Sequence, residues 1–303
     1  MINTTSAPRT ALDNGVIVPA NGVELCLETF GDRDDPGILL IHGAATPMHG
    51  WEDEFCERLA AGGRYAIRYD QRDTGRSVSY PPGEPDYGPD DLSADTTGIL
   101  DALALESAHY VGISMGGGIA MGAALGYPER VASLTLIGTS PGGSDLPPMS
   151  KDFLTFSDRY EQPNWSDREA VIDYLIAFMR VCTGSADVLD EDDLRVRLGR
   201  DVDRTTNIES SLTNHFAMKL GPSRRDRLGA ITIPTLVIHG TDDPVFPPGH
   251  AEALAREIPG AELLLLERTG HLLLRPAWDT VVPALLAHTS RLPDAARSRA
   301  GAG

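Results

Sequence analysis

Cysteine is scarce in this chain, and long apolar runs are absent from it. Its 303 residues include three cysteines, Cys26, Cys56 and Cys182, which are widely spaced and form no CxxC pair. An odd, scattered set of this kind indicates neither a disulfide framework nor a zinc site. No stretch approaches the roughly 18 consecutive apolar residues that a membrane-spanning helix needs, so we expect no membrane partner.

Basic residues are also few, because 26 Lys and Arg stand against 44 Asp and Glu and give a formal net charge of −18. Such an acidic chain repels phosphate backbones and anionic lipid headgroups, which argues against nucleic-acid partners. The start of the chain, MINTTSAPRT, lacks the pattern of a secretory signal. We therefore expect a soluble, cytoplasmic protein. No metal or cofactor motif is visible, and the sequence leaves the oligomeric state open.

Short apolar runs alternate with helical patterns along most of the chain. Runs such as GILLIH, SLTLIG and PTLVIH are continuous and bounded by turn residues, which is typical of parallel strands buried on both faces. The alternation predicts an α/β fold with a mostly parallel eight-stranded sheet, flanked by helices and edged by an antiparallel pair. The expected strands are 16–19, 23–30, 37–42, 65–69, 109–113, 132–137, 235–239 and 262–266, and the expected helices are 52–61, 89–105, 115–127, 248–257 and 283–288.

Residues 145–225 interrupt the alternation, because they hold helical patterns and no convincing strand. Ser166 and Glu169 have the spacing of a capping box. An apolar stripe of helical period follows, formed by Val171, Tyr174, Leu175, Phe178, Met179 and Cys182. We expect a helical cap here, inserted after the sixth strand of a core made of residues 15–144 and 226–290. Residues 1–14 and 291–303 are expected to be flexible termini.

The segment GISMG at residues 112–116 places a serine, Ser114, between a predicted strand and a helix of small residues. This strand–turn–helix context is typical of a nucleophile elbow, in which the serine hydroxyl projects from a sharp turn. The helix behind it directs unsatisfied N–H groups at the reacting oxygen. We predict that Ser114 is a nucleophile. The alternative is a glycine-rich turn that only lets the helix pack closely on the sheet.

A serine nucleophile needs a base, and His271 follows the last predicted strand, where its side chain can reach the carboxyl edge of the sheet. The preceding strand ends in GTDDP, which offers Asp242 and Asp243 as the acid that orients the imidazole. Adjacent residues in a tight turn point in different directions, so only one of them can serve. We favour Asp243, directly before the proline, and interpret Asp242 as a turn or capping residue.

The third predicted strand ends in HGAA at residues 42–45. A turn of small residues lets a backbone N–H approach a substrate carbonyl, so we predict an oxyanion hole formed by the N–H groups of Ala44 and Met115. Four side chains are candidates for binding the substrate: Trp51, Phe178, His215 and Phe216. Packing inside the core or the cap is the alternative role for each of them.

These motifs together resemble the α/β-hydrolase family, from about residue 37 to residue 275. Residues 42–77, the elbow, IPTLVIHGTDDPVFP and residues 214–228 are similar to the aclacinomycin methylesterases of anthracycline biosynthesis. The resemblance implies a triad of Ser114, Asp243 and His271 with Ala44 and Met115 as donors. This chain departs from those esterases at His42, where they have Met, and at Ala44-Ala45, where they have Gly-Asn. Residues 145–200 do not match clearly.

The sequence therefore predicts a serine carboxylic-ester hydrolase that acts through an acyl-enzyme. The substrate is expected to be a small to medium, mostly apolar ester, with the methyl ester of a natural product as one case. Serine at the elbow disfavours the epoxide hydrolases and haloalkane dehalogenases of this fold, which use Asp there. Hydrolysis of lactones, amides or C–C bonds, perhydrolysis, and a binding protein without catalysis remain as alternatives.

Overall fold

One sheet of eight strands forms the centre of the computed structural model, which describes residues 15–184 and 189–290. The strands are β1 (Val16–Ala20), β2 (Val23–Phe30), β3 (Gly37–Ile41), β4 (Tyr65–Tyr69), β5 (Ala108–Ile113), β6 (Val131–Ile137), β7 (Thr235–Gly240) and β8 (Glu262–Leu266). Their order in the sheet is β1-β2-β4-β3-β5-β6-β7-β8. Strand β2 pairs antiparallel with β1 and β4, and all other neighbours are parallel. The predicted sheet with its antiparallel edge is confirmed.

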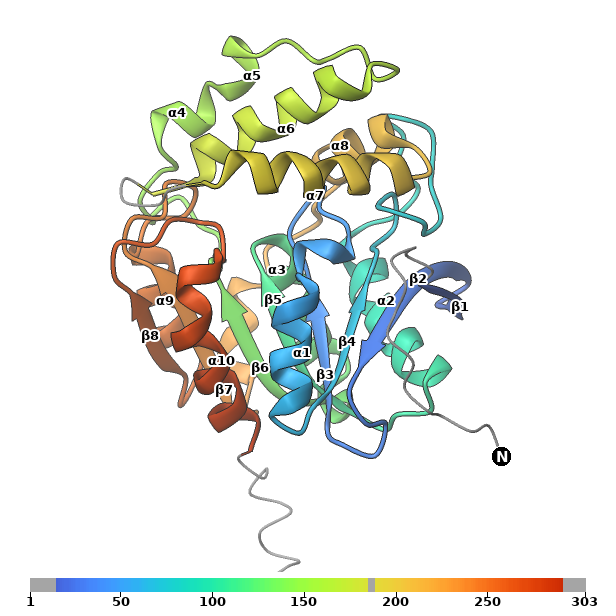
Figure 1. Ribbon diagram of the computed structural model, residues 1–303. Helices are drawn as coiled ribbons and strands as arrows, with labels where there is room; N and C mark the ends of the chain where they lie inside the picture. Colours follow the sequence, from blue (N-terminus) through green and yellow to red (C-terminus); the bar gives the residue numbers. More distant parts are fainter. Residues whose placement is uncertain (1–14, 185–188, 291–303) are drawn as a thin grey trace, which may run out of the picture.

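Both faces of the sheet are covered by helices (Figure 1). In β3, Ile38 and Leu40 belong to one core cluster, and Leu39 and Ile41 belong to the other. The first cluster includes residues of α1 (Asp53–Ala61) and α10 (Arg275–Thr289), and the second includes residues of α2 (Pro89–Ala102), α3 (Met115–Gly126) and α9 (Gly249–Glu257). Short 3₁₀ turns lie at η1 (Met48–Gly50), η2 (Pro128–Arg130) and η3 (Arg225–Ala230). Burial on two faces explains the continuous apolar runs.

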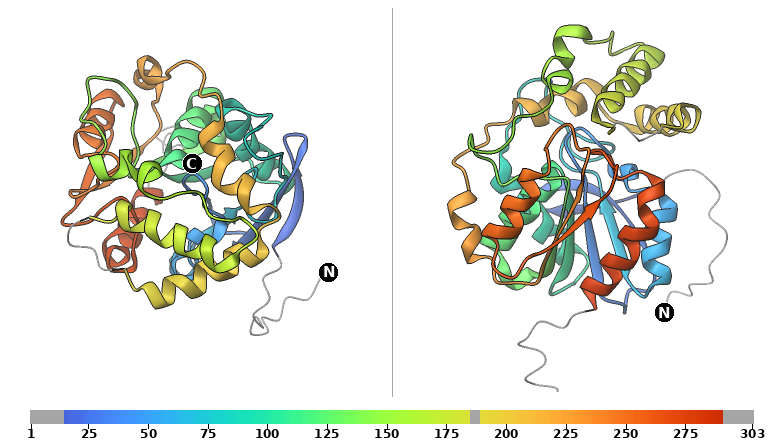
Figure 2. Two further views of the ribbon diagram at one scale, coloured as in Figure 1. Left: turned by 90° about the horizontal axis from the view of Figure 1, so that it is seen from above. Right: turned by 90° about the vertical axis from the view of Figure 1, so that its left-hand side faces the viewer.

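Between β6 and β7 in the sequence, the described residues form five α-helices, which make up a cap. They are α4 (Lys151–Leu154), α5 (Phe156–Arg159), α6 (Arg168–Cys182), α7 (Glu191–Arg204) and α8 (Ile208–Ala217). Figures 1 and 2 show them above the carboxyl ends of the parallel strands. Helices α6 and α7 pack through an apolar cluster of their own, formed by Ile172, Ile176, Leu194 and Leu198. The cap therefore covers the carboxyl ends of the parallel strands, which is where ligands bind in this architecture.

Two local predictions need correction. The N-cap of α6 is Asp167, whose carboxylate accepts a hydrogen bond from the Ala170 N–H, so the Ser166 capping box does not form. A carboxylate at this position also interacts favourably with the helix dipole. In the predicted stripe of α6, Tyr174, Leu175, Phe178 and Met179 are only half-buried, because they face a cavity described below.

Helix α10 also differs from the prediction. The sequence predicted that this helix begins at Pro283, but it begins at Arg275 and continues through Pro283. Proline in the first turn favours helix initiation, and Pro276 occupies that place. Trp278 and Val281 of this earlier part are buried against the sheet. The packing of these apolar residues outweighs the proline within the helix. The expected flexible termini, 1–14 and 291–303, lie outside the described residues.

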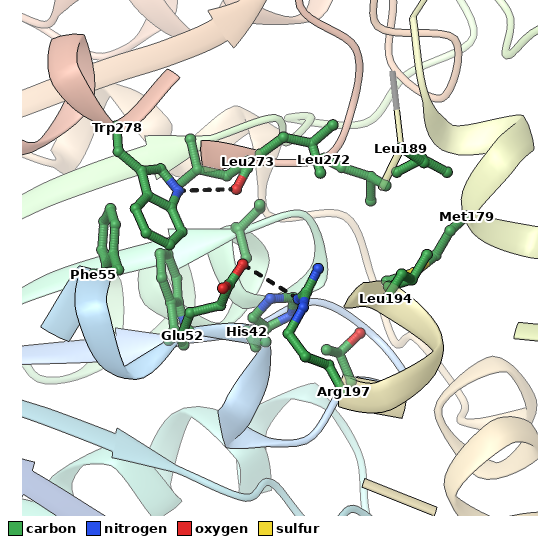
Figure 3. A pocket seen from close by; sticks show the side chains of 15 residues that line it. His42, Glu52, Phe55, Met179, Leu189, Leu194, Arg197, Leu272, Leu273 and Trp278 are labelled. Carbon is green, nitrogen blue, oxygen red and sulfur yellow. Dashed lines mark hydrogen bonds and ion pairs between the residues drawn. The ribbon is translucent and has the colours of Figure 1, made fainter. Parts of the chain in front are cut away.

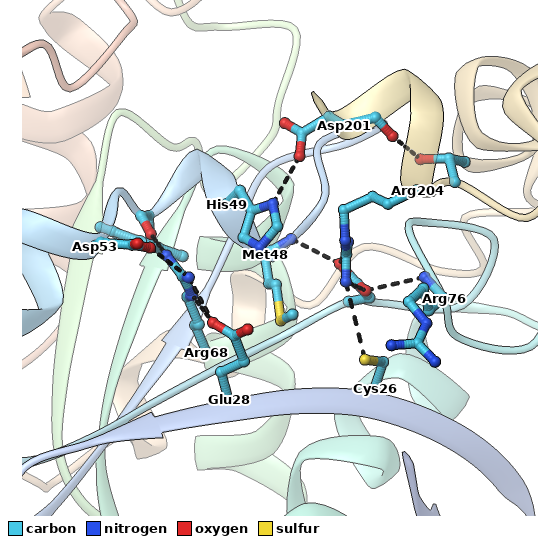
Figure 4. A network of polar contacts seen from close by, with 12 residues as sticks. Cys26, Glu28, Met48, His49, Asp53, Arg68, Arg76, Asp201 and Arg204 are labelled. Carbon is cyan, nitrogen blue, oxygen red and sulfur yellow. Dashed lines mark hydrogen bonds and ion pairs between the residues drawn. The ribbon is translucent and has the colours of Figure 1, made fainter. Parts of the chain in front are cut away.

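The cap is attached to the core through a buried ion pair (Figure 4). Arg204, at the end of α7, places its two terminal nitrogens 3.0 and 2.9 Å from the carboxylate oxygens of Asp70, which follows β4. Both side chains are buried, and the Asp70 carboxylate also accepts the backbone N–H groups of Met48 and Arg76. A buried carboxylate that has lost its hydration is stable only while its cationic partner is present.

Replacing Arg204 with alanine is expected to lower the free energy of unfolding by about 3–5 kcal/mol, because it leaves the Asp70 carboxylate buried without its cation. Urea denaturation followed by circular dichroism measures the loss. Arg195→Ala is the matched control on the same helix, since the pairs of Arg195 with Asp173 and Glu169 are exposed. That variant should lose less than about 1 kcal/mol. Equal losses in the two variants would contradict the role assigned to the buried pair.

Candidate active site

Ser114 lies at the turn between β5 and α3, in a backbone conformation with φ of 53° and ψ of −121°. Residues other than glycine rarely adopt positive φ, so the surroundings must enforce it. The Ser114 N–H donates to Ile137 O at 2.9 Å, and its carbonyl accepts the Thr139 hydroxyl at 2.7 Å. A β-carbon at Gly112 would clash with the backbone of Gly116, which explains one glycine of the motif. The elbow predicted from the sequence is thus formed.

His271 and Asp243 meet beside this elbow. His271 follows β8, and its Nδ1 lies 2.8 Å from Oδ2 of Asp243, in the turn after β7. Both lie next to Gly138 at the end of β6, where an added β-carbon would be 3.5 Å from the imidazole and 3.6 Å from the carboxylate. Phe246 contacts the His271 ring edge-on at 5.6 Å and lines the same cavity as Ser114. The ends of β5, β6, β7 and β8 therefore bring the three predicted residues to one region.

The two candidate acids are clearly different in the structure. Asp243 is 3% exposed, and its Oδ1 accepts the N–H groups of Val245 and Phe246 at 2.8 and 2.9 Å. Burial by itself would raise the pKa of this carboxyl, but the hydrogen bonds and the nearby imidazoles outweigh it and hold the pKa below its usual range. Asp242 is half-exposed, and its N–H donates to Thr269 O. Only Asp243 holds the His271 ring.

The turn at residues 42–45 faces the elbow, because a β-carbon at Gly43 would lie 3.7 Å from the Ser114 hydroxyl oxygen. The Gly43 N–H donates to Nδ1 of His42 at 2.7 Å, and the Ala45 N–H donates to Nδ1 of His215 at 2.9 Å. Among the described residues, no acceptor binds the Ala44 N–H, which lies between these two. Met115 begins α3, where N–H groups lack partners within the helix. The structure therefore leaves both N–H groups available, as the predicted oxyanion hole of Ala44 and Met115 requires.

A cavity of about 560 Å³ lies under the cap, next to the oxyanion turn. Ala44 and His42 form part of its floor, and aromatic residues of the cap line much of the rest: Phe153, Phe156, Tyr174, Phe178 and Phe216. The polar part of its lining consists of Arg197 and of His49 and Asp201. Nδ1 of His49 lies 2.9 Å from Oδ1 of Asp201. This volume and lining suit a ligand of drug-like size with an apolar body.

Two further cavities border the site. One of about 510 Å³ is lined by Ser114, Met115 and Phe246, and also by Ser140 and Arg224. A smaller one, of about 70 Å³, lies beside His42 and is lined by residues of α1, α6, α7 and α10 (Figure 3). There Arg197 contacts Glu52 at 3.3 Å, so the charge of this arginine is balanced within the wall.

The four candidate substrate contacts occupy three different places. Phe178 and Phe216 line the cavity under the cap, and Phe216 is 61% exposed at its edge. Trp51 borders the small cavity and packs between His42 and Phe55. His215 is buried beneath the oxyanion turn and does not line the cavity.

Sequence reasoning did not single out Phe246 or Arg197 for the site. Phe246 lies in the turn that holds Asp243, and Arg197 belongs to a helix whose rotation the sequence does not specify. Within residues 15–184 and 189–290, no cluster of His, Cys, Asp or Glu is placed to hold a metal ion. The described helices also include none that is long and apolar enough to cross a membrane.

A strained serine, a histidine oriented by a buried aspartate, and two backbone donors form a set that is suited to acyl transfer. A profile of the family described as alpha/beta hydrolase fold matches residues 36–274. The chain belongs to this family.

Within this family, sequence comparison with characterised proteins indicates the type of reaction. Rhodomycin D methylesterase DauP of Streptomyces sp. (strain C5) is 34% identical over 90% of this chain and 97% of its own length. Rhodomycin D methylesterase DnrP of Streptomyces peucetius is 34% identical over 88% of this chain and 95% of its own. A 2-hydroxy-6-oxononadienedioate/2-hydroxy-6-oxononatrienedioate hydrolase of Paraburkholderia phymatum is 30% identical over 89% and 93%. The chain is accordingly a carboxylic-ester hydrolase.

Solved structures agree on the fold. A meta-cleavage product hydrolase from Pseudomonas fluorescens IP01 superimposes with a TM-score of 0.73 at 24% identity, over 91% of this chain and 97% of that one. The esterase EaEST from Exiguobacterium antarcticum gives a TM-score of 0.71 at 23% identity, over 92% and 100%. At this level of identity the likeness shows the fold alone.

Proposed function

We propose that this chain hydrolyses the methyl ester of a bulky, ring-bearing carboxylic acid, with the acyl group in the cavity under the cap. The aromatic lining of that cavity, next to the Ala44 donor, is the observation that carries the proposal. The names of the two methylesterase relatives support methanol as the leaving group. Because methanol is small, the large cavity must serve the acid portion of such an ester.

In the proposed mechanism, the Ser114 oxygen attacks the ester carbonyl while Nε2 of His271 takes the hydroxyl proton. The Asp243 carboxylate, 2.8 Å from Nδ1, keeps that nitrogen protonated and stabilises the imidazolium. The N–H groups of Ala44 and Met115 bind the oxyanion, and each is worth on the order of 3 kcal/mol.

Collapse of the intermediate breaks the bond to the methoxy group, which leaves as methanol with the proton from His271. Water, activated by His271, then attacks the acyl-enzyme. The products are the free acid, methanol and the regenerated serine, so one water is consumed for each ester cleaved.

The charge of the site argues against a dianionic substrate. The formal net charge of the chain is −18, and the Arg197 cation in the cavity wall is balanced by Glu52 and by Asp193 at 2.8 Å. A carboxylate placed in the cavity would find no free cation there among the described residues. This favours neutral esters over dienedioates, the substrate class in the name of the third relative.

A substrate panel tests the proposal. The methyl esters of anthracene-2-carboxylic acid and acetic acid separate acyl size, and naphthyl acetate places the rings on the alcohol. We expect kcat/KM to be at least about 10-fold higher for the anthracene methyl ester than for either acetate, since burial of added apolar area stabilises the bound state. Phe178→Ala should remove most of this preference and leave acetate hydrolysis unchanged. A preference for acetates would contradict the proposed substrate.

The same panel separates the remaining alternatives. A lactone, an amide and a 2-hydroxy-6-oxo-dienoate of comparable size should react at least about 10-fold more slowly than the anthracene methyl ester. Faster cleavage of one of these would instead assign the site to that reaction. Tight binding of one of these compounds without turnover would favour the alternative that the chain is a binding protein without catalysis.

A further inference from the structure

His215 connects the cap to the oxyanion turn of the core. It belongs to α8, is 4% exposed, and has both ring nitrogens bonded to backbone. Nδ1 lies 2.9 Å from the Ala45 nitrogen, and Nε2 lies 2.9 Å from Arg72 O. A backbone N–H can only donate and a carbonyl can only accept, so Nε2 carries the hydrogen and Nδ1 the lone pair.

The hydrogen bond to His215 fixes Ala45, which directly follows Ala44, the predicted oxyanion donor. Ala45 has φ of 59°, in the left-handed region that alanine seldom adopts unless its neighbours hold it there. On the other side of Ala44, the Gly43 N–H is bound by His42. The two imidazoles thus engage the N–H groups on both sides of Ala44, and among the described residues the Ala44 N–H is left without a partner.

The environment keeps His215 in the form that this contact needs. Burial lowers the pKa of His215 to about 4, although the bond to Arg72 and the charge of Asp73 oppose the shift. The guanidinium of Arg72 is turned away to Asp95, at 2.7 Å. The ring of Tyr87 packs edge-on against the imidazole. The ring is therefore neutral near pH 7, and Nδ1 remains an acceptor.

We propose that His215 is a positioning residue for ester hydrolysis, which fixes the oxyanion turn by accepting the Ala45 N–H and so aims the Ala44 N–H at the reacting carbonyl. The inference rests on the role proposed for Ala44. It predicts that the acceptor at Nδ1 matters for catalysis, whereas the donor at Nε2 only anchors α8 on the core.

Two amide variants separate these functions. His215→Asn can place an oxygen near the position of Nδ1 and keep the bond to Ala45, but it loses the bond to Arg72. His215→Gln can reach Arg72 with its amide nitrogen, but it loses the acceptor for Ala45. His109→Gln is the control, because His109 is also buried and is bonded to Ser133 at 2.8 Å. His109 lies at the start of β5, whereas Ser114 follows the other end of that strand.

Hydrolysis of p-nitrophenyl acetate, a small ester, is measured so that the result does not depend on the proposed acyl group. We expect His215→Gln to lower kcat about 10–100-fold with KM within about 2-fold, since a displaced catalytic group costs this much. His215→Asn should stay within about 3-fold of wild type. The inhibition constant of a trifluoromethyl ketone, whose adduct carries an oxyanion, should weaken in parallel with kcat. Thermal unfolding is recorded for all variants.

Equal kcat values in the Asn and Gln variants, or losses that follow the melting temperature as in His109→Gln, would overturn the positioning role. The wild-type protein provides a check without mutation. Nitrogen-15 NMR of the histidines should show His215 neutral and protonated at Nε2 at pH 6, and a charged ring or the other tautomer would also overturn the role. Failure of the wild-type protein to hydrolyse any ester would instead contradict the proposed function.

Discussion

Ser114→Ala is expected to lower kcat for p-nitrophenyl ester hydrolysis by at least about 10⁴-fold, because in the proposed mechanism the Ser114 oxygen forms the acyl-enzyme. Substrate binding should change little, since the cavity under the cap is lined by other residues. Alanine keeps the β-carbon of Ser114, so the strained turn and the hydrogen bonds of its backbone remain. Discontinuous assays at high enzyme concentration measure the residual rate.

The structure offers a matched control for this variant. Ser140 lines the same cavity as Ser114, and its hydroxyl lies 2.7 Å from Nδ1 of a second histidine, His250. Nε2 of His250 lies 2.8 Å from Pro147 O, so the Ser140–His250 pair connects the end of β6 to the segment that leads into α4 of the cap. Ser140→Ala should retain wild-type kcat. A fluorophosphonate probe should label the wild type and Ser140→Ala, but not Ser114→Ala.

Labelling that survives in Ser114→Ala and disappears in Ser140→Ala would move the nucleophile to the second pair. Absence of labelling in the wild type, together with tight binding of a small ligand, would favour a binding protein that has kept the geometry without the activity. The intact mass of the labelled protein distinguishes these results, because one probe adds one defined increment.

Most of the core follows from local signals in the sequence. The predicted strands agree with the observed ones to within about one residue at each end, since continuous apolar runs stop at turn residues on both sides. The same local logic placed Ser114 at the elbow, where the glycines are required by the close approach of β5, α3 and the end of β3. Adjacent parallel strands end at one edge, which is why His271 and Asp243 could be expected to meet.

Contacts between distant segments were beyond such reasoning. The bond between Ala45 and His215 joins residues 170 positions apart, and the Asp70–Arg204 pair joins residues 134 apart. In the sequence, His215 is one histidine in a helix, and nothing local says whether it faces the cavity or the turn. The cavity lining depends on the rotation of α6, where Ile172 and Ile176 pack on α7 and leave the Phe178 side half-buried.

Exchanging Asp243 for asparagine should lower kcat by about 10⁴-fold with little change in KM. The reason lies in the two backbone N–H groups of Val245 and Phe246, which both bind Oδ1. They will hold the amide oxygen of asparagine in that place, so its NH₂ group must face Nδ1 of His271. The imidazole then accepts at Nδ1 and carries its hydrogen on Nε2, where it cannot take the proton of Ser114.

Asp242→Asn is the control for this prediction, because it makes the same change one residue earlier in the same turn. Asp242 is half-exposed and does not hold the imidazole, so kcat should remain within about 2-fold of wild type. The catalytic defect of Asp243→Asn should also shrink at high pH, where hydroxide can substitute for the lost base. If Asp242→Asn lost activity and Asp243→Asn retained it, the acid would be the other member of the pair, and the hydrogen bond at 2.8 Å would be structural.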